Sequence, residues 1–216
     1  MPHDLHSSEA DEGLALLIDK LCRTRSLSFG EYERLIAQRT PGTARELASR
    51  ADAMRRQVYG TKVFTRGLIE VSSFCKNDCL YCGIRRSNAT ARRYRLSADE
   101  IVKCANIGYD LGFRTFVLQG GEDPFFADDV LCGIIGQIRA AHPDCAVTLS
   151  FGERSRKSYE RLHEAGAERY LLRHETASPA LYRRWHPPEM SLENRMRCLS
   201  DLREIGYAVG AGFMVG

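Results

Sequence analysis

Three cysteines lie close together in the chain, in the spacing C-x3-C-x2-C. They are Cys75, Cys79 and Cys82, and polar or small residues separate them. Thiolates bind zinc and iron–sulfur clusters, and both kinds of site usually take four protein ligands. No other His or Cys lies near enough in the sequence to be an obvious fourth ligand. Three thiolates could instead hold three irons of a [4Fe–4S] cluster and leave the fourth iron open, as catalytic metal sites leave a free position.

Two other interpretations of these cysteines remain open. A structural zinc site would need a distant fourth ligand, and Cys104 is a poor candidate because it falls within a helical pattern. A disulfide with a spare thiol does not fit a reducing compartment. A non-catalytic iron–sulfur or zinc-binding protein is therefore the alternative to a catalytic cluster. We expect Cys104, Cys132 and Cys198, which lie in amphipathic helical patterns, to be buried packing residues.

Composition excludes several classes of protein. The 216 residues carry a net charge of +3, with 44% hydrophobic and 27% charged residues, which is typical of a soluble globular protein. So small a charge does not indicate nucleic acid or an anionic membrane as the main partner. There is no apolar run of the ~18 residues that span a bilayer, and the polar N-terminus has no signal-peptide core. A cytoplasmic protein is expected, with no nucleic-acid and no membrane partner.

The first part of the chain, residues 1–62, is predicted to be a helical N-terminal extension. Its apolar residues recur at helical spacing. Ser28-x-x-Glu31 and Thr43-x-x-Glu46 have the pattern of capping boxes, so each predicts the start of a helix. Residues 63–216 are predicted to form a second domain.

That second domain alternates two kinds of pattern. Short apolar runs suited to buried parallel strands occur at 67–72, 115–119, 146–150, 169–173 and 208–215. Helical patterns lie between them at 98–111, 128–141, 155–165 and 191–205. This order predicts an α/β fold with a parallel sheet and right-handed crossovers. It fits either an open doubly wound sheet or part of a (β/α)8 barrel, and a full barrel takes ~250 residues. We therefore expect the N-terminal portion of a longer protein, cut after the fifth strand.

Unusual polar clusters follow every one of the predicted strands. The cysteines follow the first strand, and the others are 119–124 (QGGEDP), 150–154 (SFGER), 173–176 (RHET) and 212–216 (GFMVG). In parallel α/β folds, functional residues gather at the carboxyl ends of the strands. The sequence therefore predicts an active site on this one rim. A cluster of arginines between Arg85 and Arg95 is interpreted as a solvated or ion-paired surface, with a docking surface as the alternative.

The cysteine spacing, with Tyr81 before the last cysteine, resembles the radical S-adenosylmethionine (SAM) superfamily. Gly120-Gly121-Glu122, one strand later, matches the turn that binds the methionine amino group in that superfamily. Two glycines allow backbone carbonyls to approach an ammonium closely, and Glu122 adds charge. The resemblance implies a radical-SAM (β/α)8 TIM-type barrel, a [4Fe–4S] cluster on the three cysteines and SAM on its open iron.

Longer segments resemble the HydE-type maturases of [FeFe]-hydrogenase within that superfamily. Among them are YLLRHETA (170–177) and GYAVGAGFMVG (206–216), and the similarity runs from about Arg66 to the end. The resemblance implies that Glu175 and Arg195 contact SAM, with Arg195 on the methionyl carboxylate, which its planar fork suits. It further implies that Gln119, Thr148 and Arg173 line the substrate space. No side chain is assigned as a general acid or base.

The activity implied by the resemblance is reductive cleavage of SAM to methionine and a 5′-deoxyadenosyl radical, in maturation of the hydrogenase H-cluster. The implied partners are a small iron- and sulfur-containing or amino-acid-derived substrate, an electron donor such as ferredoxin or flavodoxin, and other hydrogenase maturases. Biotin synthase and methylornithine synthase are close relatives. An enzyme of either kind is therefore the alternative function.

Overall fold

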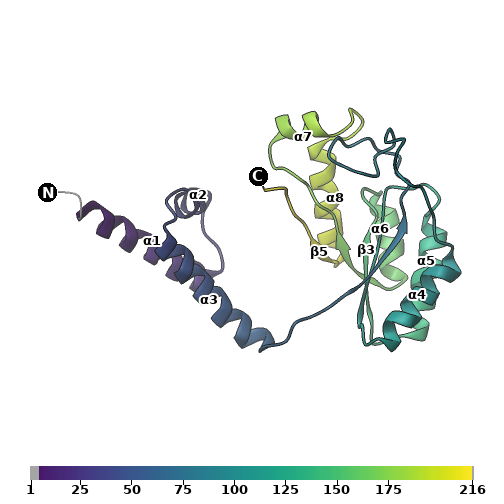
Figure 1. Cartoon of the computed structure of the whole chain (residues 1–216), viewed down its shortest axis with the longest axis horizontal. Coiled ribbons are helices and arrows are strands. Elements are labelled where there is room, and N and C mark those ends of the chain that lie inside the picture. Colours follow the sequence, from purple (N-terminus) through teal and green to yellow (C-terminus); the bar gives the residue numbers. More distant parts are fainter. Residues whose placement is uncertain (1–4, 216) are drawn as a thin grey trace. The chain divides into compact units, whose positions relative to one another are not determined.

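The computed structural model describes the backbone of residues 5–215 and the side chains of residues 12–215. The chain divides into two compact units, with the boundary between Phe64 and Thr65 (Figure 1). This boundary lies close to the one expected after residue 62. The two units are described in turn.

The N-terminal unit contains three helices, α1 (Leu5–Thr24), α2 (Phe29–Ala37) and α3 (Pro41–Tyr59). Its core is a cluster of the buried residues Leu14, Ile18, Leu27 and Leu35. The predicted capping box at the start of α2 is confirmed. The backbone N–H of Ser28 donates to the Glu31 carboxylate at 2.8 Å, and the Ser28 side chain caps the N3 position in return.

The predicted start of α3 at Thr43 is wrong. The helix begins at Pro41, with Thr40 as its N-cap, and Thr43 occupies the N3 position. The Thr40 hydroxyl accepts from the Thr43 backbone N–H at 3.2 Å. Proline favours the first helical position because its φ is already helical and it lacks an N–H that would need a partner. Glu46 instead pairs with Arg50 one turn later.

The second unit is a five-stranded parallel sheet with helices between the strands, as predicted. Its strands are β1 (Gly67–Ser72), β2 (Thr115–Gly120), β3 (Ala146–Ser150), β4 (Ala167–Leu171) and β5 (Ala208–Gly210), paired in the order β1-β2-β3-β4-β5. Its helices are α4 (Ala98–Asp110), α5 (Asp128–Ala141), α6 (Arg156–Glu164), α7 (Pro179–Trp185) and α8 (Leu192–Ile205). Consecutive parallel pairing is what the first strands of a (β/α) barrel require.

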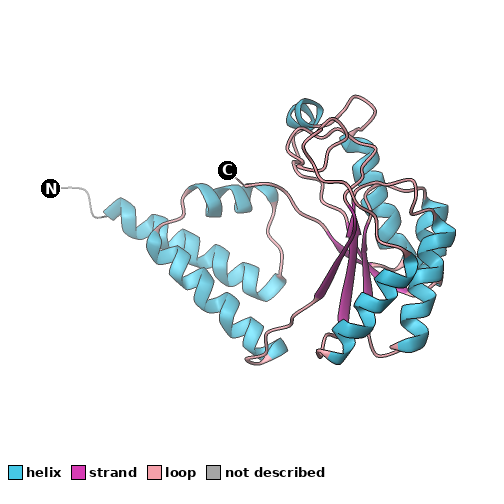
Figure 2. Ribbon diagram, turned by 45° about the vertical axis from the view of Figure 1, so that its right-hand side comes forward, coloured by secondary structure: helices cyan, strands magenta, loops and turns pink. Residues whose placement is uncertain are grey.

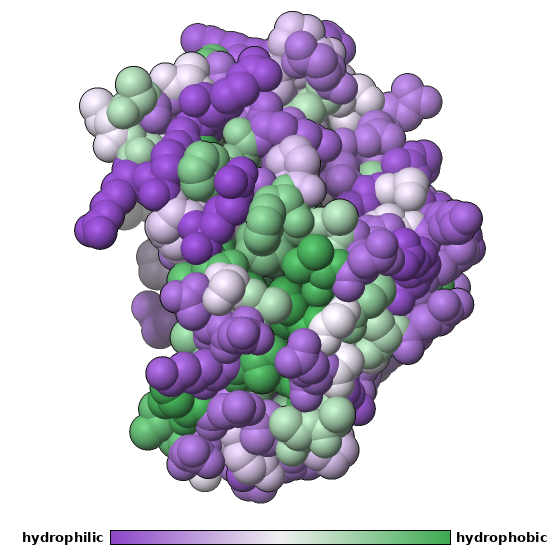
Figure 3. Space-filling model, turned by 90° about the vertical axis from the view of Figure 1, so that its right-hand side faces the viewer, coloured by the Kyte–Doolittle hydropathy of each residue, from purple (hydrophilic) through white to green (hydrophobic). Residues whose placement is uncertain are grey.

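The helices cover one face of this sheet (Figure 2). Side chains on that face are fully buried, among them Val71, Phe116, Leu118, Val147 and Leu149. The opposite face alternates with it and is more open, as shown by Leu68, which is 55% exposed. The outer sides of the helices carry mostly hydrophilic residues, with hydrophobic side chains gathered near the middle of the view in Figure 3. The core therefore lies between the sheet and its helices.

Three strands differ from their predicted bounds, although β2 differs only by the addition of Gly120 at its end. The predicted strand 169–173 begins two residues earlier, because Gly166 ends α6 with a left-handed φ of 112° and the chain turns directly into β4. The predicted strand 208–215 is regular only as far as Gly210. Its partner β4 ends at Leu171, and beyond that point only an isolated bridge joins Phe213 to Glu175.

Helix α7 was not predicted. It is a short helix that begins at a Ser–Pro pair: Ser178 is the N-cap and Pro179 takes the first helical position. That pair is a recognised start signal, but seven residues are too few to show a helical period.

Cysteine burial matches the expectation only in part. Cys198 is buried and Cys132 is half-buried, whereas Cys104 is exposed on α4. The buried prediction for Cys104 is therefore wrong, since the core face of this helix is formed by Ile101, Ala105 and Gly108. Within residues 5–215, no helix combines the length and the hydrophobicity needed to cross a membrane.

Candidate cofactor site at the carboxyl ends of the strands

A cavity of about 460 Å³ lies at the carboxyl ends of the strands, within the size range of small-molecule sites. Residues that follow β1, β2, β3 and β4 line it, together with Arg195 from α8. All but one of the predicted site residues are in this lining: Cys75, Cys79, Tyr81, Cys82, Gln119, Gly120, Gly121, Glu122, Arg173, Glu175 and Arg195. Of the described residues after β5, 211–215, none lines the cavity, so four of the five predicted strand ends contribute; Gly216 of the fifth cluster lies outside the described residues.

Thr148 is the predicted residue that does not line the cavity. It lies on β3, where it pairs with Val117 on one side and Arg169 on the other. Ser150, two residues further on and on the same face of the strand, does line the cavity. Thr148 therefore sits one layer deeper, and its predicted contact with a substrate stays a prediction.

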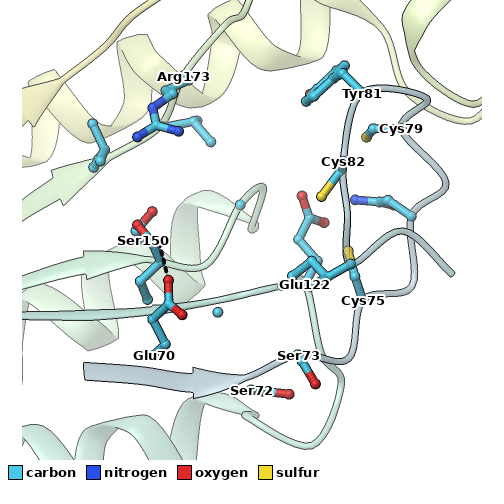
Figure 4. A pocket seen from close by; sticks show the side chains of 18 of the residues that line it. Glu70, Ser72, Ser73, Cys75, Cys79, Tyr81, Cys82, Glu122, Ser150 and Arg173 are labelled. Atoms are coloured by element: carbon cyan, nitrogen blue, oxygen red, sulfur yellow. Dashed lines mark hydrogen bonds between the residues drawn. The ribbon is translucent and has the colours of Figure 1, made fainter. Parts of the chain in front are cut away.

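The three cysteines lie on one loop at the side of the cavity (Figure 4). All three are free and half-buried. Burial raises the pKa of Cys75 above its ordinary value and raises the pKa of Cys79 to about 11. Within the described residues, no group of three His, Cys, Asp or Glu side chains is gathered closely enough to hold a metal ion. The three thiols share one loop and one cavity, and their binding of a cluster stays a prediction.

Arg93 holds this loop in shape from inside the arginine cluster. Its guanidinium donates to the backbone carbonyls of Ile84 at 2.8 Å, Arg85 at 2.7 Å and Asn88 at 3.3 Å, and also to that of Ser73. Multiple carbonyl acceptors suit the five donors of a guanidinium. Arg93 is therefore a structural residue of the cysteine loop, whereas Arg86 and Arg92 are exposed.

The Gly120–Glu122 turn packs directly against the cysteine loop. A β-carbon built on Gly121 would lie 2.2 Å from the Phe74 carbonyl oxygen and 2.7 Å from the β-carbon of Cys75. Only glycine fits such an approach. The backbone N–H of Lys76 also donates to the Glu122 carbonyl at 3.0 Å. The glycine that was predicted to allow close approach to a ligand is thus needed first to let the two loops meet.

The Glu122 carboxylate has fixed partners at the cavity wall. Its Oε1 accepts from the backbone N–H of Glu153 at 3.0 Å, and its Oε2 lies 3.2 Å from Nζ of Lys76. Gly152 makes room for it, since a β-carbon there would lie 2.1 Å from Oε1 of Glu122. Gly152 also has a left-handed φ of 70°. The turn after β3 therefore holds the Glu122 carboxylate in place at the cavity wall.

Tyr81 is oriented by a residue that the sequence did not single out. Its hydroxyl lies 2.9 Å from Nε2 of His186, and Nδ1 of His186 lies 2.9 Å from the Tyr182 carbonyl oxygen. A carbonyl only accepts, so Nδ1 carries the proton. Burial lowers the pKa of His186, which keeps the ring neutral and leaves Nε2 to accept from Tyr81. No periodicity or motif marks His186, which follows the short helix α7.

Arg195 is buried, with only 8% of its side chain exposed. Its Nε donates to Glu153 at 2.7 Å and its Nη1 to the Arg173 carbonyl at 2.7 Å. Burial alone would lower the pKa of Arg195, but nearby Tyr182 and Glu153 outweigh burial and raise it. The guanidinium is therefore charged, and its Nη1–Nη2 edge still has donors for a carboxylate. Glu153 was not foreseen, although it belongs to the SFGER cluster.

Glu175 lines the cavity with an unusual backbone. Its φ of 64° is left-handed, which is uncommon for a residue other than glycine. The backbone N–H groups of His174 and Glu175 both donate to the Gly212 carbonyl at 3.0 Å. Gly212, which follows β5 and does not line the cavity, thus fixes the backbone of Glu175.

The face of the sheet opposite the helices carries a charged residue that was not predicted from the sequence. Glu70 on β1 lines the cavity, and its Oε1 accepts from Nε2 of Gln119 at 3.3 Å. Arg173 lies on the other side of the cavity in Figure 4. The signal for Glu70 was a single charge within an otherwise apolar strand pattern. Carboxylate, amide and guanidinium groups thus face the same space.

Three thiols and a Gly-Gly-Glu turn thus lie together at the carboxyl ends of a parallel β/α unit, an arrangement that can be compared with known protein families. The sequence profile of the Radical SAM superfamily matches residues 69–216, more than half of the chain. The chain therefore belongs to the Radical SAM superfamily. The predicted superfamily and its TIM-type fold are confirmed.

The similar proteins come from the branches that the sequence indicated. The chain is 49% identical over 166 residues to the [FeFe] hydrogenase maturase subunit HydE of Thermotoga maritima, covering 77% of this chain and 47% of that protein. It is 27% identical to the 3-methylornithine synthase of Methanosarcina barkeri, over 92% of this chain and 56% of that one. Biotin synthases are also similar, among them that of Staphylococcus haemolyticus at 27% identity, covering 71% of this chain and 49% of that protein.

Solved structures agree on the fold. The crystal structure of methylornithine synthase (PylB) superposes with a TM-score of 0.80 at 25% identity, over 93% of this chain and 59% of that one. The [FeFe]-hydrogenase maturase HydG superposes with a TM-score of 0.82 at 22% identity, over 97% of this chain and 48% of that one. The chain thus spans about half the length of the proteins that it matches.

Proposed function

We propose that this chain belongs to an enzyme that reductively cleaves SAM at a [4Fe–4S] cluster held by Cys75, Cys79 and Cys82. The observation that carries the proposal is the shared cavity, which these free thiols line together with the Gly120–Glu122 turn, Glu175 and Arg195. Three thiolates suit a cluster with one open iron, and the glycine cradle suits a ligand that binds close to backbone. When bound there, the cluster and SAM supply electron transfer into the sulfonium and release of a 5′-deoxyadenosyl radical.

Different residues of the cavity would bind different parts of SAM. The turn at Gly120 and Gly121 offers backbone carbonyls to the SAM ammonium, and Glu122 adds a carboxylate at the same wall. Arg195 offers its remaining guanidinium edge to the methionyl carboxylate. Glu175 and Tyr81 also line this cavity and would complete the contacts to the ligand. Each of these assignments follows the superfamily pattern and is a proposal for this chain.

The protein's own contribution is binding, orientation and exclusion of water. Arg195 and Tyr81 are each held by a second residue, Glu153 and His186, so neither side chain has to be ordered when a ligand binds. Side chains that are already ordered lose less conformational entropy when a ligand binds, so they oppose binding less. No side chain of the cavity is required as a general acid or base in this proposal.

We further propose a role in maturation of the [FeFe]-hydrogenase H-cluster. The identity of 49% to a HydE supports it, against 27% to methylornithine and biotin synthases, which remain the alternative. The substrate would be a small molecule, iron- and sulfur-containing or derived from an amino acid, placed between Gln119 and Arg173, which line the cavity; the predicted contact with Thr148 would need the substrate to reach one layer deeper. Its partners would be an electron donor such as ferredoxin or flavodoxin, and other hydrogenase maturases.

The test is anaerobic reconstitution of the intact protein with iron and sulfide, followed by SAM and dithionite. We expect 5′-deoxyadenosine, measured by mass spectrometry, and its loss in Cys79→Ala. The matched control is Cys104→Ala, which removes an exposed thiol on α4 and should leave the yield unchanged. Retention of the cluster and of cleavage in Cys79→Ala would refute the proposal. Activation of apo-hydrogenase by the protein with the other maturases, but no biotin or methylornithine formation, would decide the subfamily.

A further inference from the structure

Asp123 directly follows Glu122, and its carboxylate is completely buried at the edge of the site. Its Oδ2 accepts from Nε of Arg95 at 2.6 Å and from Oγ of Ser72 at 2.7 Å, while its Oδ1 accepts from Nη2 of Arg95 at 3.0 Å. The backbone N–H of Phe125 donates to Oδ1 at 3.1 Å. Burial alone would raise the pKa of Asp123, but the hydrogen bonds from Arg95 and Ser72 outweigh it, so the pKa lies below its ordinary value. A charged, fully hydrogen-bonded carboxylate therefore sits behind the Gly120–Glu122 turn.

Ser72 and Arg95, the two side chains that hydrogen-bond to Asp123, both also contact Phe74. The Oγ of Ser72 donates to Asp123 and accepts from the Phe74 backbone N–H at 3.0 Å. The guanidinium of Arg95 lies 3.9 Å from the centre of the Phe74 ring, in a cation–π contact. Phe74 directly precedes Cys75. One carboxylate thus holds both the backbone and the ring of the residue before the first cysteine.

The same carboxylate also belongs to the turn on the other side. The backbone N–H of Asp123 donates to the Gly121 carbonyl at 2.8 Å. Gly121 is in turn packed against the Phe74 carbonyl and the β-carbon of Cys75. Asp123 therefore connects the two segments that the proposed function gives to iron and to the SAM ammonium. It does not line the cavity itself.

We infer that Asp123 is a positioning residue, which holds the Gly120–Glu122 turn in register with Cys75 through Ser72 and Arg95. A ligand that must bind the open iron and the Gly120–Glu122 turn at the same time depends on this register, because both contacts have to be held in one geometry. The inference rests on the proposed function and deepens it. Nothing in the contacts of Asp123 brings it to the ligand, so its effect on binding is indirect.

The test compares Asp123→Asn with Asp128→Asn in the intact, reconstituted protein. The amide keeps the shape of Asp123 but loses the charge and one acceptor. Asp128 is a matched control, because it is also part of a poorly exposed ion pair, with Arg154 at 2.9 Å, and is not in the cavity lining. Three quantities are measured: iron and sulfide per chain, the thermal midpoint, and the SAM dissociation constant from the change that SAM causes in the reduced cluster's electron paramagnetic resonance.

We expect Asp123→Asn to bind iron and sulfide as the parental protein does, and to bind SAM about tenfold more weakly, the change typical of a lost charge-assisted hydrogen bond. Asp128→Asn should keep the parental SAM affinity. Equal SAM affinity in Asp123→Asn and the parental protein would overturn the inference, and so would an equal loss in Asp128→Asn. If Asp123→Asn does not fold, Ser72→Ala serves instead, with about threefold weaker SAM binding expected from one neutral hydrogen bond and unchanged affinity overturning the inference. A parental protein without any SAM-dependent change would refute the proposed function instead.

Discussion

The hydroxyl of Tyr81 lies 2.9 Å from Nε2 of His186, so a residue 105 positions further along the chain orients the aromatic ring between the second and third cysteines. The contact is reinforced at the backbone, where the N–H of Leu80 donates to the Trp185 carbonyl at 2.9 Å. His186 also stacks on Tyr182, with ring centres 3.8 Å apart. The end of α7 and His186, which follows it, thus support the cysteine loop.

His186→Phe should weaken SAM binding while leaving cluster assembly intact. The phenyl ring keeps the stack on Tyr182 but cannot accept from Tyr81, so the Tyr81 ring loses its fixed orientation. We expect the SAM dissociation constant to rise about fivefold, in line with the loss of one hydrogen bond. His142→Phe, which removes a half-buried histidine bonded to Asn106 and outside the cavity lining, is the control. An unchanged dissociation constant in His186→Phe would show that this hydrogen bond does not matter for the ligand.

Gly121→Ala should be more damaging than its size suggests. Its new methyl group would lie 2.2 Å from the Phe74 carbonyl oxygen, so the turn and the cysteine loop must separate. Forcing an extra methyl into a packed contact typically costs about 1–3 kcal/mol. We expect a loss of that size in the free energy of unfolding, measured with urea on the metal-free protein, together with loss of 5′-deoxyadenosine production.

Gly133→Ala is the matched control for that substitution. Gly133 lies within α5, and a β-carbon there meets nothing within 4 Å. Since alanine favours the helix over glycine, we expect a gain of about 0.5–1 kcal/mol and full activity. Equal losses in the two variants would mean that the contact with Phe74 is not the cause.

Alkylation of Cys79 in the metal-free protein should depend on pH in an unusual range. Thiolate is the reactive form, and burial raises the pKa of this thiol to about 11. The rate constant should therefore rise about tenfold per pH unit to near pH 11, whereas in the urea-unfolded chain it should level off near the ordinary pKa of about 8.5. Peptide mass spectrometry measures both rates, and a native plateau near pH 8.5 would contradict the burial of this thiol.

The same shift has a consequence for stability. Because the folded pKa lies above the unfolded one, the folded chain holds the proton more tightly between about pH 8.5 and 11. The contribution of Cys79 to the free energy of unfolding is therefore fully present below pH 8.5 and is lost as the pH rises towards 11. Urea titrations of the metal-free protein at pH 8 and pH 10 should show this decrease, and Cys79→Ala should show less of it.

Glu153→Ala should destabilise the second unit strongly. It leaves Arg195, with only 8% of its side chain exposed, without its carboxylate, and removing one partner of a buried ion pair costs about 3–5 kcal/mol. Glu46→Ala is the control, since its partner Arg50 is exposed on α3 and such pairs are worth under about 1 kcal/mol. Unfolding in urea separates the two cases, and a small effect in Glu153→Ala would show that Arg195 finds another partner.

Much of this architecture could be predicted from sequence, because the strands and long helices carry clear periods and caps. Cys75 and Gly121 could be placed in one site because parallel strands bring their carboxyl ends together, whereas Arg195, on helix α8, was placed there only by the family resemblance. His186, Glu153 and Asp123 were missed as supporting residues for a different reason. Their contacts join segments far apart in the chain, and nothing in their local patterns records the partner. Thr148 shows a different limitation. Alternation along a strand predicts which face of the sheet a side chain lies on, but not whether it is near enough to the strand end to line the cavity.

Glu175 has a φ of 64°, a conformation in which glycine would be at ease and a glutamate is strained. Selection for stability alone would drift towards glycine at this position. A population of variants screened only for folding should therefore accumulate Glu175→Gly, whereas one screened for ligand-dependent turnover should retain the glutamate. The left-handed φ of Glu175 therefore supports the proposed role of its side chain in the cavity.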